Sequence, residues 1–218
     1  YGHSEIAEMI MKKSSELQID LNFKNNKGNS AFHLACDKGH SETVKMILKN
    51  SLELKLSLNS KGKDGKTAFH AACCTGHSEI AEMIMKKSSE LEIDLNIKDK
   101  YGWTAFHAAC FYGHSETVEM ILKNSSELKI DLNIKNTCGK YSEYNDGKTA
   151  FHAACLKGHS KIAEMIMKNS SELKIDLNSK DNVGWTAFHA ACCYGHSEIA
   201  EMIMKKSSEL KINLNIKD

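Results

Sequence analysis

The residues with the clearest chemical potential in this chain are histidines and cysteines that recur together. Five times the sequence places His, Cys and His at positions i, i+3 and i+7, as in His107, Cys110 and His114. These side chains bind zinc, but a structural zinc site needs four ligands that converge tetrahedrally. A glycine precedes the last histidine each time, and the trio recurs rather than occurring once. We therefore interpret these residues as structural and expect no metal ion and no cofactor.

Signatures of catalysis are also missing from the sequence. A cysteine–histidine nucleophile would need one copy of the trio that differs from the others, and no copy does. The sequence contains no phosphate-binding glycine loop, no paired-carboxylate site and no hydrolase elbow. We expect that the chain is not an enzyme and has no small-molecule substrate.

The spacing of the histidines shows how the chain is organised. Thr-Ala-Phe-His or Ser-Ala-Phe-His occurs five times, ending at His33, His70, His107, His152 and His189. Gly-His ends at His3, His40, His77, His114, His159 and His196, so successive copies are 37, 37, 37, 45 and 37 residues apart. Units of this length cannot bury a core alone, and they must stack on their neighbours to form an elongated solenoid.

One unit, residues 61–97, predicts two helices after a turn. Glycine and aspartate at its start favour the turn, and Thr67 is a suitable N-cap. A short helix is expected from about Ala68 to Thr75, and Gly76 would end it in a left-handed conformation. A second helix is expected from about Ser78 to Lys87, because its apolar residues repeat at i, i+3 and i+4 and form a face that can be buried.

The order of these residues resembles the ankyrin repeat. The shared features are Gly-x-Thr-x-x-His-x-Ala-Cys-x-x-Gly-His, a second amphipathic helix and then Ile-Asp-Leu-Asn. The resemblance implies an all-α helix-turn-helix solenoid with β-hairpin-like turns, in which the first histidine holds the turn and the cysteine packs between helices. We expect one array over residues 1–218, with a leading second helix and five complete repeats: 1–23 (partial), 24–60, 61–97, 98–134, 135–179 and 180–216.

Three features depart from the family pattern. Alanine replaces the usual proline in Thr-Ala-Phe-His, so the preset backbone angle at the first helical position is lost. The period is 37 rather than 33 residues, because a segment such as Ser125–Lys129 extends the link after the second helix. The repeat at 135–179 also carries eight extra residues, Gly139–Asp146. Since Tyr1 lies within a repeat and Asp218 begins another, we expect the array to be a piece of a longer one.

Composition narrows the partners and the compartment. Formal charge is +1, with 29 basic residues that are all lysines and 28 acidic ones. The absence of arginine disfavours nucleic acid as a partner. No apolar run approaches the roughly 20 residues that span a bilayer, so we expect no membrane insertion. Equivalent cysteines would lie too far apart for disulfides, so we expect a reducing, intracellular location in the cytoplasm, with Cys138 exposed and reactive.

A column of lysines occupies one equivalent position in every unit. It could attract an acidic protein or a phosphate, but nearby aspartates could neutralise it, and a solvated ladder is the interpretation we favour. The column comprises Lys24, Lys61, Lys98, Lys135, Lys180 and Lys217.

Aromatic residues occur mainly where the units differ, and this pattern suggests a site for a partner. In ankyrin-like arrays the turn tips and first helices line a concave side where partners bind, and Tyr and Trp dominate interface hot spots. We therefore predict an aromatic groove, flanked by the insertion, as the partner site. The alternative left open is that Trp103 and Trp185 only cover the neighbouring turn. The candidate residues are Tyr101, Trp103, Phe111, Tyr112, Tyr141, Tyr144, Trp185 and Tyr194.

The sequence thus predicts a non-catalytic scaffold that binds a partner protein. A first alternative is a regulatory or targeting segment of a larger enzyme, channel or effector. A second is a spacer or self-assembling element, because the uncapped ends could stack head to tail and associate weakly.

Overall fold

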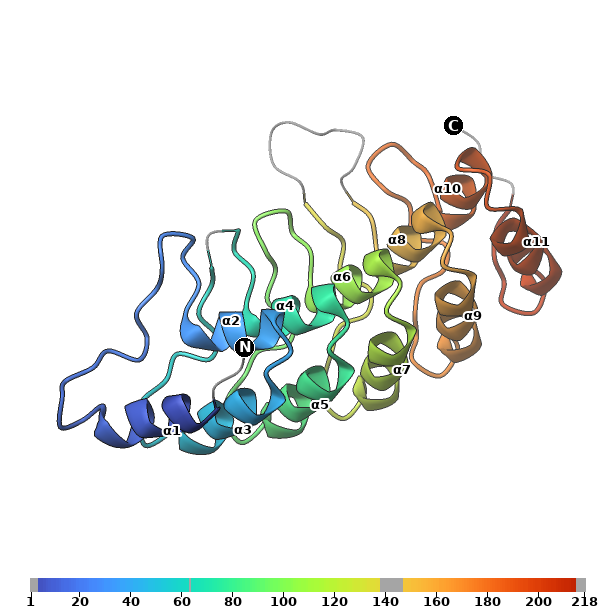
Figure 1. The fold of residues 1–218 in the computed structure, drawn as a ribbon. Helices are drawn as coiled ribbons and strands as arrows, with labels where there is room; N and C mark the ends of the chain where they lie inside the picture. Colours follow the sequence, from blue (N-terminus) through green and yellow to red (C-terminus); the bar gives the residue numbers. More distant parts are fainter. Residues whose placement is uncertain (1–3, 63, 138–146, 215–218) are drawn as a thin grey trace.

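The computed structural model describes residues 4–62, 64–137 and 147–214 of the chain. In this part the chain forms eleven α-helices and no β-strand, and the helices lie in two layers (Figure 1). One layer holds short helices: α2 (Ala31–Asp37), α4 (Ala68–Thr75), α6 (Ala105–Tyr112), α8 (Ala150–Lys157) and α10 (Ala187–Cys193). The other holds longer ones: α1 (Ser4–Lys13), α3 (Ser41–Asn50), α5 (Ser78–Lys87), α7 (Ser115–Asn124), α9 (Ser160–Asn169) and α11 (Ser197–Lys206).

Each short helix contacts the short helices of the adjacent units, and each long helix contacts the neighbouring long ones. This is the arrangement predicted for a helix-turn-helix solenoid, and it is confirmed. No helix in the described ranges has the length and apolar character needed to cross a bilayer.

The predicted helix boundaries at 61–97 are confirmed, and the caps explain them. The Thr67 hydroxyl accepts a hydrogen bond from the His70 amide at 3.4 Å, and the Thr67 amide donates to Nδ1 of His70 at 3.2 Å. This reciprocal pair satisfies two of the amides that a helix start leaves free. Gly76 ends α4 with a φ of 75°, in the left-handed region that suits glycine.

The turns before the short helices are hairpin-like without forming a β-ladder. In the third complete unit the Asp99 amide donates to the Trp103 carbonyl at 2.8 Å and the Gly102 amide to the Asp99 carbonyl at 3.0 Å. Adjacent turns are joined by single backbone bonds, such as that from the Lys100 amide to the Asp64 carbonyl at 3.0 Å. The turns therefore lie side by side along one edge of the helical layers (Figure 1).

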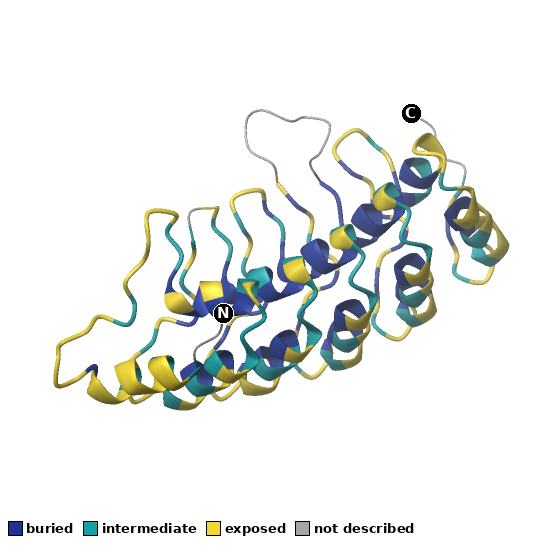
Figure 2. Ribbon diagram, in the orientation of Figure 1, coloured by how far each residue is buried: buried dark blue, intermediate teal, exposed yellow. Residues whose placement is uncertain are grey.

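The core lies between the two layers and is built from the same positions in successive units (Figure 2). On α5, Ile80, Ala81, Ile84 and Met85 are all buried, as the apolar pattern predicts, while Met83 is only partly buried. Each such isoleucine contributes about 1.5–3 kcal/mol to stability. Alanines on the short helices, such as Ala109 and Ala154, are fully buried, and their small size allows adjacent helices to approach closely.

An asparagine ladder, which the sequence analysis missed, explains how the longer period is accommodated. The extended link brings Glu92 to a φ of 51°, which L-residues rarely adopt. Its carbonyl accepts a bond from Nδ2 of Asn59 in the preceding unit at 2.8 Å, and Oδ1 of Asn59 accepts from the Asp94 amide at 2.9 Å. One asparagine side chain therefore satisfies both the carbonyl of the left-handed residue and the backbone amide two residues later. The same pair of bonds is made by Asn22, Asn96, Asn133 and Asn178.

The lysine column has a structural role that goes beyond a solvated ladder. The Lys24 ammonium donates to the Lys61 carbonyl at 2.8 Å, and Lys61 donates to the Lys98 carbonyl at 2.8 Å. Lys98 and Lys135 continue the series to the equivalent carbonyl of the next unit. Each exposed cation therefore joins two units, and Lys217 lies outside the described residues.

Candidate functional site

In the four complete units before the last, the first histidine is a hydrogen-bonding bridge to the next unit. In α6, Nδ1 of His107 lies 3.3 Å from the Thr104 amide, and Nε2 lies 3.1 Å from the Lys148 carbonyl of the next unit. An amide can only donate and a carbonyl can only accept, so the ring is neutral with its proton on Nε2. Burial lowers the pKa of His107 to about 4, and it does the same for His152.

In three units the second histidine bonds in the opposite direction, as His114, His159 and His196 do. Nε2 of His159 lies 3.0 Å from the Phe111 carbonyl at the end of α6, in the preceding unit. Its ring covers Gly113, where a Cβ atom would lie 2.6 Å from Cε1 of His159. That glycine therefore meets two requirements, a positive φ and a close approach. Because the two histidines of a unit serve different neighbours, they do not converge on a metal, and the described ranges hold no group of three or more His, Cys, Asp or Glu that could bind one.

Four of the five trio cysteines are packing residues, whereas Cys192 in the last unit is exposed, contrary to the expectation, because no further unit in the described ranges covers it. Cys36, Cys73, Cys110 and Cys155 are fully buried in the helix layers, and all are free thiols. Burial raises the pKa of each of these thiols, so they stay protonated and unreactive at neutral pH. Cys138, predicted to be exposed and reactive, lies outside the described residues.

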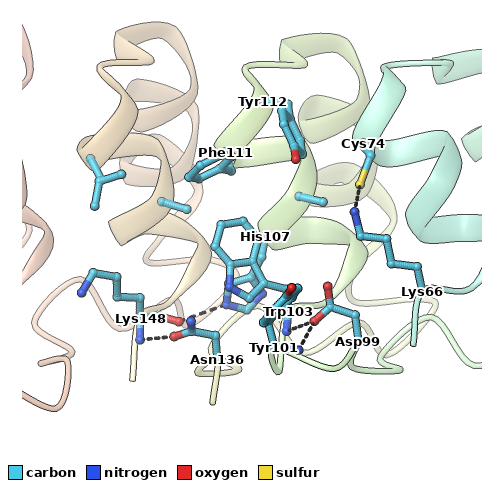
Figure 3. A pocket seen from close by; sticks show the side chains of 13 residues that line it. Lys66, Cys74, Asp99, Tyr101, Trp103, His107, Phe111, Tyr112, Asn136 and Lys148 are labelled. Atoms are coloured by element: carbon cyan, nitrogen blue, oxygen red, sulfur yellow. Dashed lines mark hydrogen bonds between the residues drawn. The ribbon is translucent and has the colours of Figure 1, made fainter. Parts of the chain in front are cut away.

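The main apolar hollow on the short-helix side lies between α6 and α8 (Figure 3). It has a volume of about 320 Å³. Trp103 and Phe111 meet edge to face, with ring centroids 4.9 Å apart, and Phe111 meets Tyr112 in the same way at 5.2 Å. Ala108 and Ala153 leave the space open, and Leu156 forms the far wall. We call this hollow the aromatic pocket.

The aromatic pocket exists because two adjacent units differ at equivalent positions. Trp103 directly precedes the N-cap of α6 and Phe111 lies in its last turn, whereas the next unit has Lys148 and Leu156 at these positions. The position after the capping histidine is alanine in both units. In the unit at 24–60 this position is Leu34, a side chain large enough to fill such a space.

The structure gathers only part of the predicted aromatic groove. Tyr101, Trp103, Phe111 and Tyr112 all line the pocket. Trp185 and Tyr194 belong to the last unit, are exposed, and are not among the residues that line it. Tyr141, Tyr144 and the rest of the insertion Gly139–Asp146 lie outside the described residues.

Lysines at the edge of the pocket were not identified from the sequence. Lys66, on the unit before, directs its ammonium to the Cys74 thiol at 3.4 Å (Figure 3). Burial lowers the pKa of Lys66, but Cys74, Tyr112 and Asp99 more than reverse this, so its pKa lies above the ordinary value and the group is charged at neutral pH. On the far side the Lys157 ammonium lies 4.4 Å from the centre of the Phe111 ring.

A buried ion pair lies beside the pocket. The Lys148 ammonium is 2.7 Å from Oδ2 of Asp181, with side chains only 11% and 1% exposed. The other oxygen of Asp181 accepts bonds from the amides of Val183 and Trp185, so the carboxylate holds the next turn as well. This ion pair could not be predicted from the sequence, because Lys148 and Asp181 are 33 positions apart and no local pattern links them.

Comparisons with known proteins agree with the geometry. A family model described as ankyrin repeats in three copies matches residues 52–136 and 127–218, and a model of the single ankyrin repeat matches residues 27–55. No curated protein gives a significant match.

Proposed function

The chain belongs to the ankyrin repeat family, whose members are generally protein-protein interaction modules, and we propose that it is a non-catalytic scaffold that binds a partner protein. The binding surface is the inner surface, which we define as the exposed side chains of the short helices and of the turns before them. The location that fits this function is the cytoplasm. Nucleic acid, lipid and small-molecule substrates are not part of the proposal.

The observation that carries the proposal is the aromatic pocket. Residues of the core and the caps are nearly the same in each unit, but the aromatic side chains that line the pocket stand at positions that differ from unit to unit. The stacking of repeats requires the recurring core and cap residues, but it does not explain the aromatic residues that vary between units. Tyr101 and Tyr112 are exposed at the pocket edge, and such aromatic side chains contribute strongly to interfaces.

Affinity capture from a native lysate tests the proposal, with the chain as bait and mass spectrometry as the readout. We expect partners to be lost with the triple variant Trp103→Ala, Tyr112→Ala and Tyr194→Ala, while the far-ultraviolet circular dichroism stays unchanged. Splitting this variant sharpens the test, because Tyr194 lies outside the pocket. Loss with the Trp103 and Tyr112 pair alone locates binding at the pocket. Identical protein lists from all baits would contradict the proposal.

Two other functions remain as alternatives to a free-standing scaffold. The array could be the regulatory or targeting segment of a larger enzyme, channel or effector, which the sequence of the full-length gene would show. It could also be a spacer that self-associates weakly head to tail. Head-to-tail association would use the apolar face of α1, which includes Ile6, Met9 and Ile10. Self-association predicts a mass that rises with concentration in light scattering and that Met9→Glu keeps constant.

A further inference from the structure

The inner surface of the described units carries more lysines than aspartates. Most of the aspartates already hold a partner. Asp37 pairs with Lys38 at 3.1 Å, Asp64 pairs with Lys100, and Asp181 pairs with Lys148 at 2.7 Å. Oδ1 of Asp99 accepts the amides of Tyr101 and Trp103 at 2.8 and 2.9 Å.

Outside the lysine column, three lysines of this surface have no carboxylate within ion-pair distance in the described part of the chain: Lys27, Lys66 and Lys157. Two of them lie beside the aromatic pocket, and Lys27 lies in a neighbouring hollow. Lys66 lines the pocket from the preceding unit, and Lys157 lies over Phe111 at the end of α8. The pocket is therefore an apolar hollow with a cation on each side, and Asp99 is the one carboxylate among the described residues that line it.

A second hollow continues the surface beyond Lys66. It has a volume of about 620 Å³, is lined by polar groups and shares Lys66 and Cys74 with the aromatic pocket. Lys27 lies on its wall together with Asn29 and Lys100, and with the ion-paired carboxylates of Asp37 and Asp64. An extended chain that leaves the aromatic pocket past Lys66 would thus enter a region with amide side chains and three lysines, in which both carboxylates already have lysine partners.

We propose that the aromatic pocket binds one aromatic or branched aliphatic side chain of an acidic, extended segment of the partner protein, and that Lys66 and Lys157 bind carboxylates on either side of that anchor. The proposal rests on the protein-binding function proposed above and specifies the chemistry of the partner. A pocket of this size holds one large side chain. Charge complementarity selects the acidic flanks, since acidic groups would supply the carboxylates that these lysines lack among the described residues.

The geometry also sets the spacing. Packed helices of adjacent units lie about 8–10 Å apart, and an extended chain advances about 3.3 Å per residue. One unit therefore corresponds to about three residues of the partner. The carboxylates should lie about two to four residues before and after the anchor.

A random dodecapeptide library displayed on phage, selected on the purified chain, tests the proposal. We expect peptides with Phe, Trp, Leu or Ile between acidic residues to be enriched. The double variant Lys66→Glu and Lys157→Glu should keep the anchor but select basic flanks instead, and it should bind the original acidic peptides at least ten-fold more weakly. Trp185→Ala with Tyr194→Ala is the matched control, because these aromatics lie outside the pocket, and it should select the same peptides as wild type.

Removing Phe111 could disturb folding, so the anchor is tested by filling the pocket. Ala108→Leu with Ala153→Leu places at each site the residue that the unit at 24–60 has naturally as Leu34. We expect enrichment of the anchored peptides to be lost while the circular dichroism spectrum is retained. Peptides without acidic flanks, peptides indifferent to the charge reversal, or no enrichment at all would overturn the proposal. If lysate capture still depends on Trp103 and Tyr112 in that case, the protein-binding function stands and only the acidic anchored segment is wrong.

Discussion

The stretches 61–134 and 135–216 each contain a lysine and an aspartate at equivalent positions, but the two residues form different contacts in the two stretches. In each stretch a lysine precedes the first short helix, a tryptophan precedes the second, and an aspartate opens the turn between them. In the second stretch Lys148 and Asp181 form a buried ion pair. In the first, the ammonium of Lys66 instead donates to the thiol of Cys74.

The residue four positions after the capping histidine accounts for much of this difference. That residue is Cys74 beside Lys66, and its sulfur accepts a hydrogen bond, whereas Leu156 beside Lys148 has no acceptor to offer. The tryptophans differ for the same reason. Trp103 stacks edge to face on Phe111 and forms a wall of the pocket, while the last unit has Cys193 in the place of Phe111, and Trp185 is left 36% exposed. The residue before the N-cap thus forms different contacts in different units, depending on which residue stands four positions after the capping histidine.

The largest expected effect concerns the histidine that Trp103 covers. The pKa of His107 and of His152 is about 4 in the fold against about 6.5 in the unfolded chain. Between these values the unfolded chain binds the proton and the folded one does not, so stability falls as pH falls from 6.5 to 4 and does not depend on these groups above 6.5. We expect a loss of about 3 kcal/mol for each histidine.

Urea unfolding at several pH values, followed by circular dichroism, measures this loss. His107→Gln should flatten the pH dependence by about one histidine's share, because glutamine can keep the capping bond without titrating. His189→Gln, at the equivalent place in the last unit, gauges at pH 7 the cost of altering the cap alone. An unchanged slope in the His107 variant would contradict the assignment.

The second prediction separates the two lysine and aspartate pairs. Asp181→Asn keeps an oxygen for the turn amides but removes the charge that Lys148 binds, and breaking a buried pair costs about 3 kcal/mol. Asp99→Asn makes the same change where the lysine bonds a thiol, and we expect a loss below about 1 kcal/mol. Both values come from denaturant unfolding. Equal losses would show that the two stretches are energetically alike.

The smallest expected change in stability concerns α7 and α11, the long helices of the two units that contain Trp103 and Trp185. The buried hydroxyl of Thr117 on α7 has no hydrogen-bond partner among the described residues, whereas the equivalent residue on α11 is Ile199, which is buried and apolar. Thr117→Val should therefore raise stability by about 1 kcal/mol. Thr104→Val removes a hydroxyl that His107 bonds, and it should lower stability by about 1 kcal/mol. A loss in both variants would argue against the unsatisfied hydroxyl.

The sequence determined the architecture because its signals are local and repeated. Thr67 and Gly76 fix both ends of α4, and the apolar pattern of α5 identifies its buried face, so the helix bounds at 61–97 could be predicted residue by residue. The recurrence of the trio also indicated structural histidines and packed cysteines, and the structure buries four of the five cysteines but leaves Cys192 exposed. The candidate aromatics were found because they occupy the positions that vary between units.

Only the tertiary structure decided which of these residues meet. The bonds from His107 to the Lys148 carbonyl, from Asn59 to the Glu92 carbonyl and from Lys148 to Asp181 join residues 41, 33 and 33 positions apart. Whether such groups come within hydrogen-bond distance depends on the offset between stacked units, which no local pattern encodes. For the same reason the sequence identified the aromatics but not the pocket. It took the packing of α6 between α4 and α8 to bring Phe111 and Leu156 into one pocket and to place a lysine on each side.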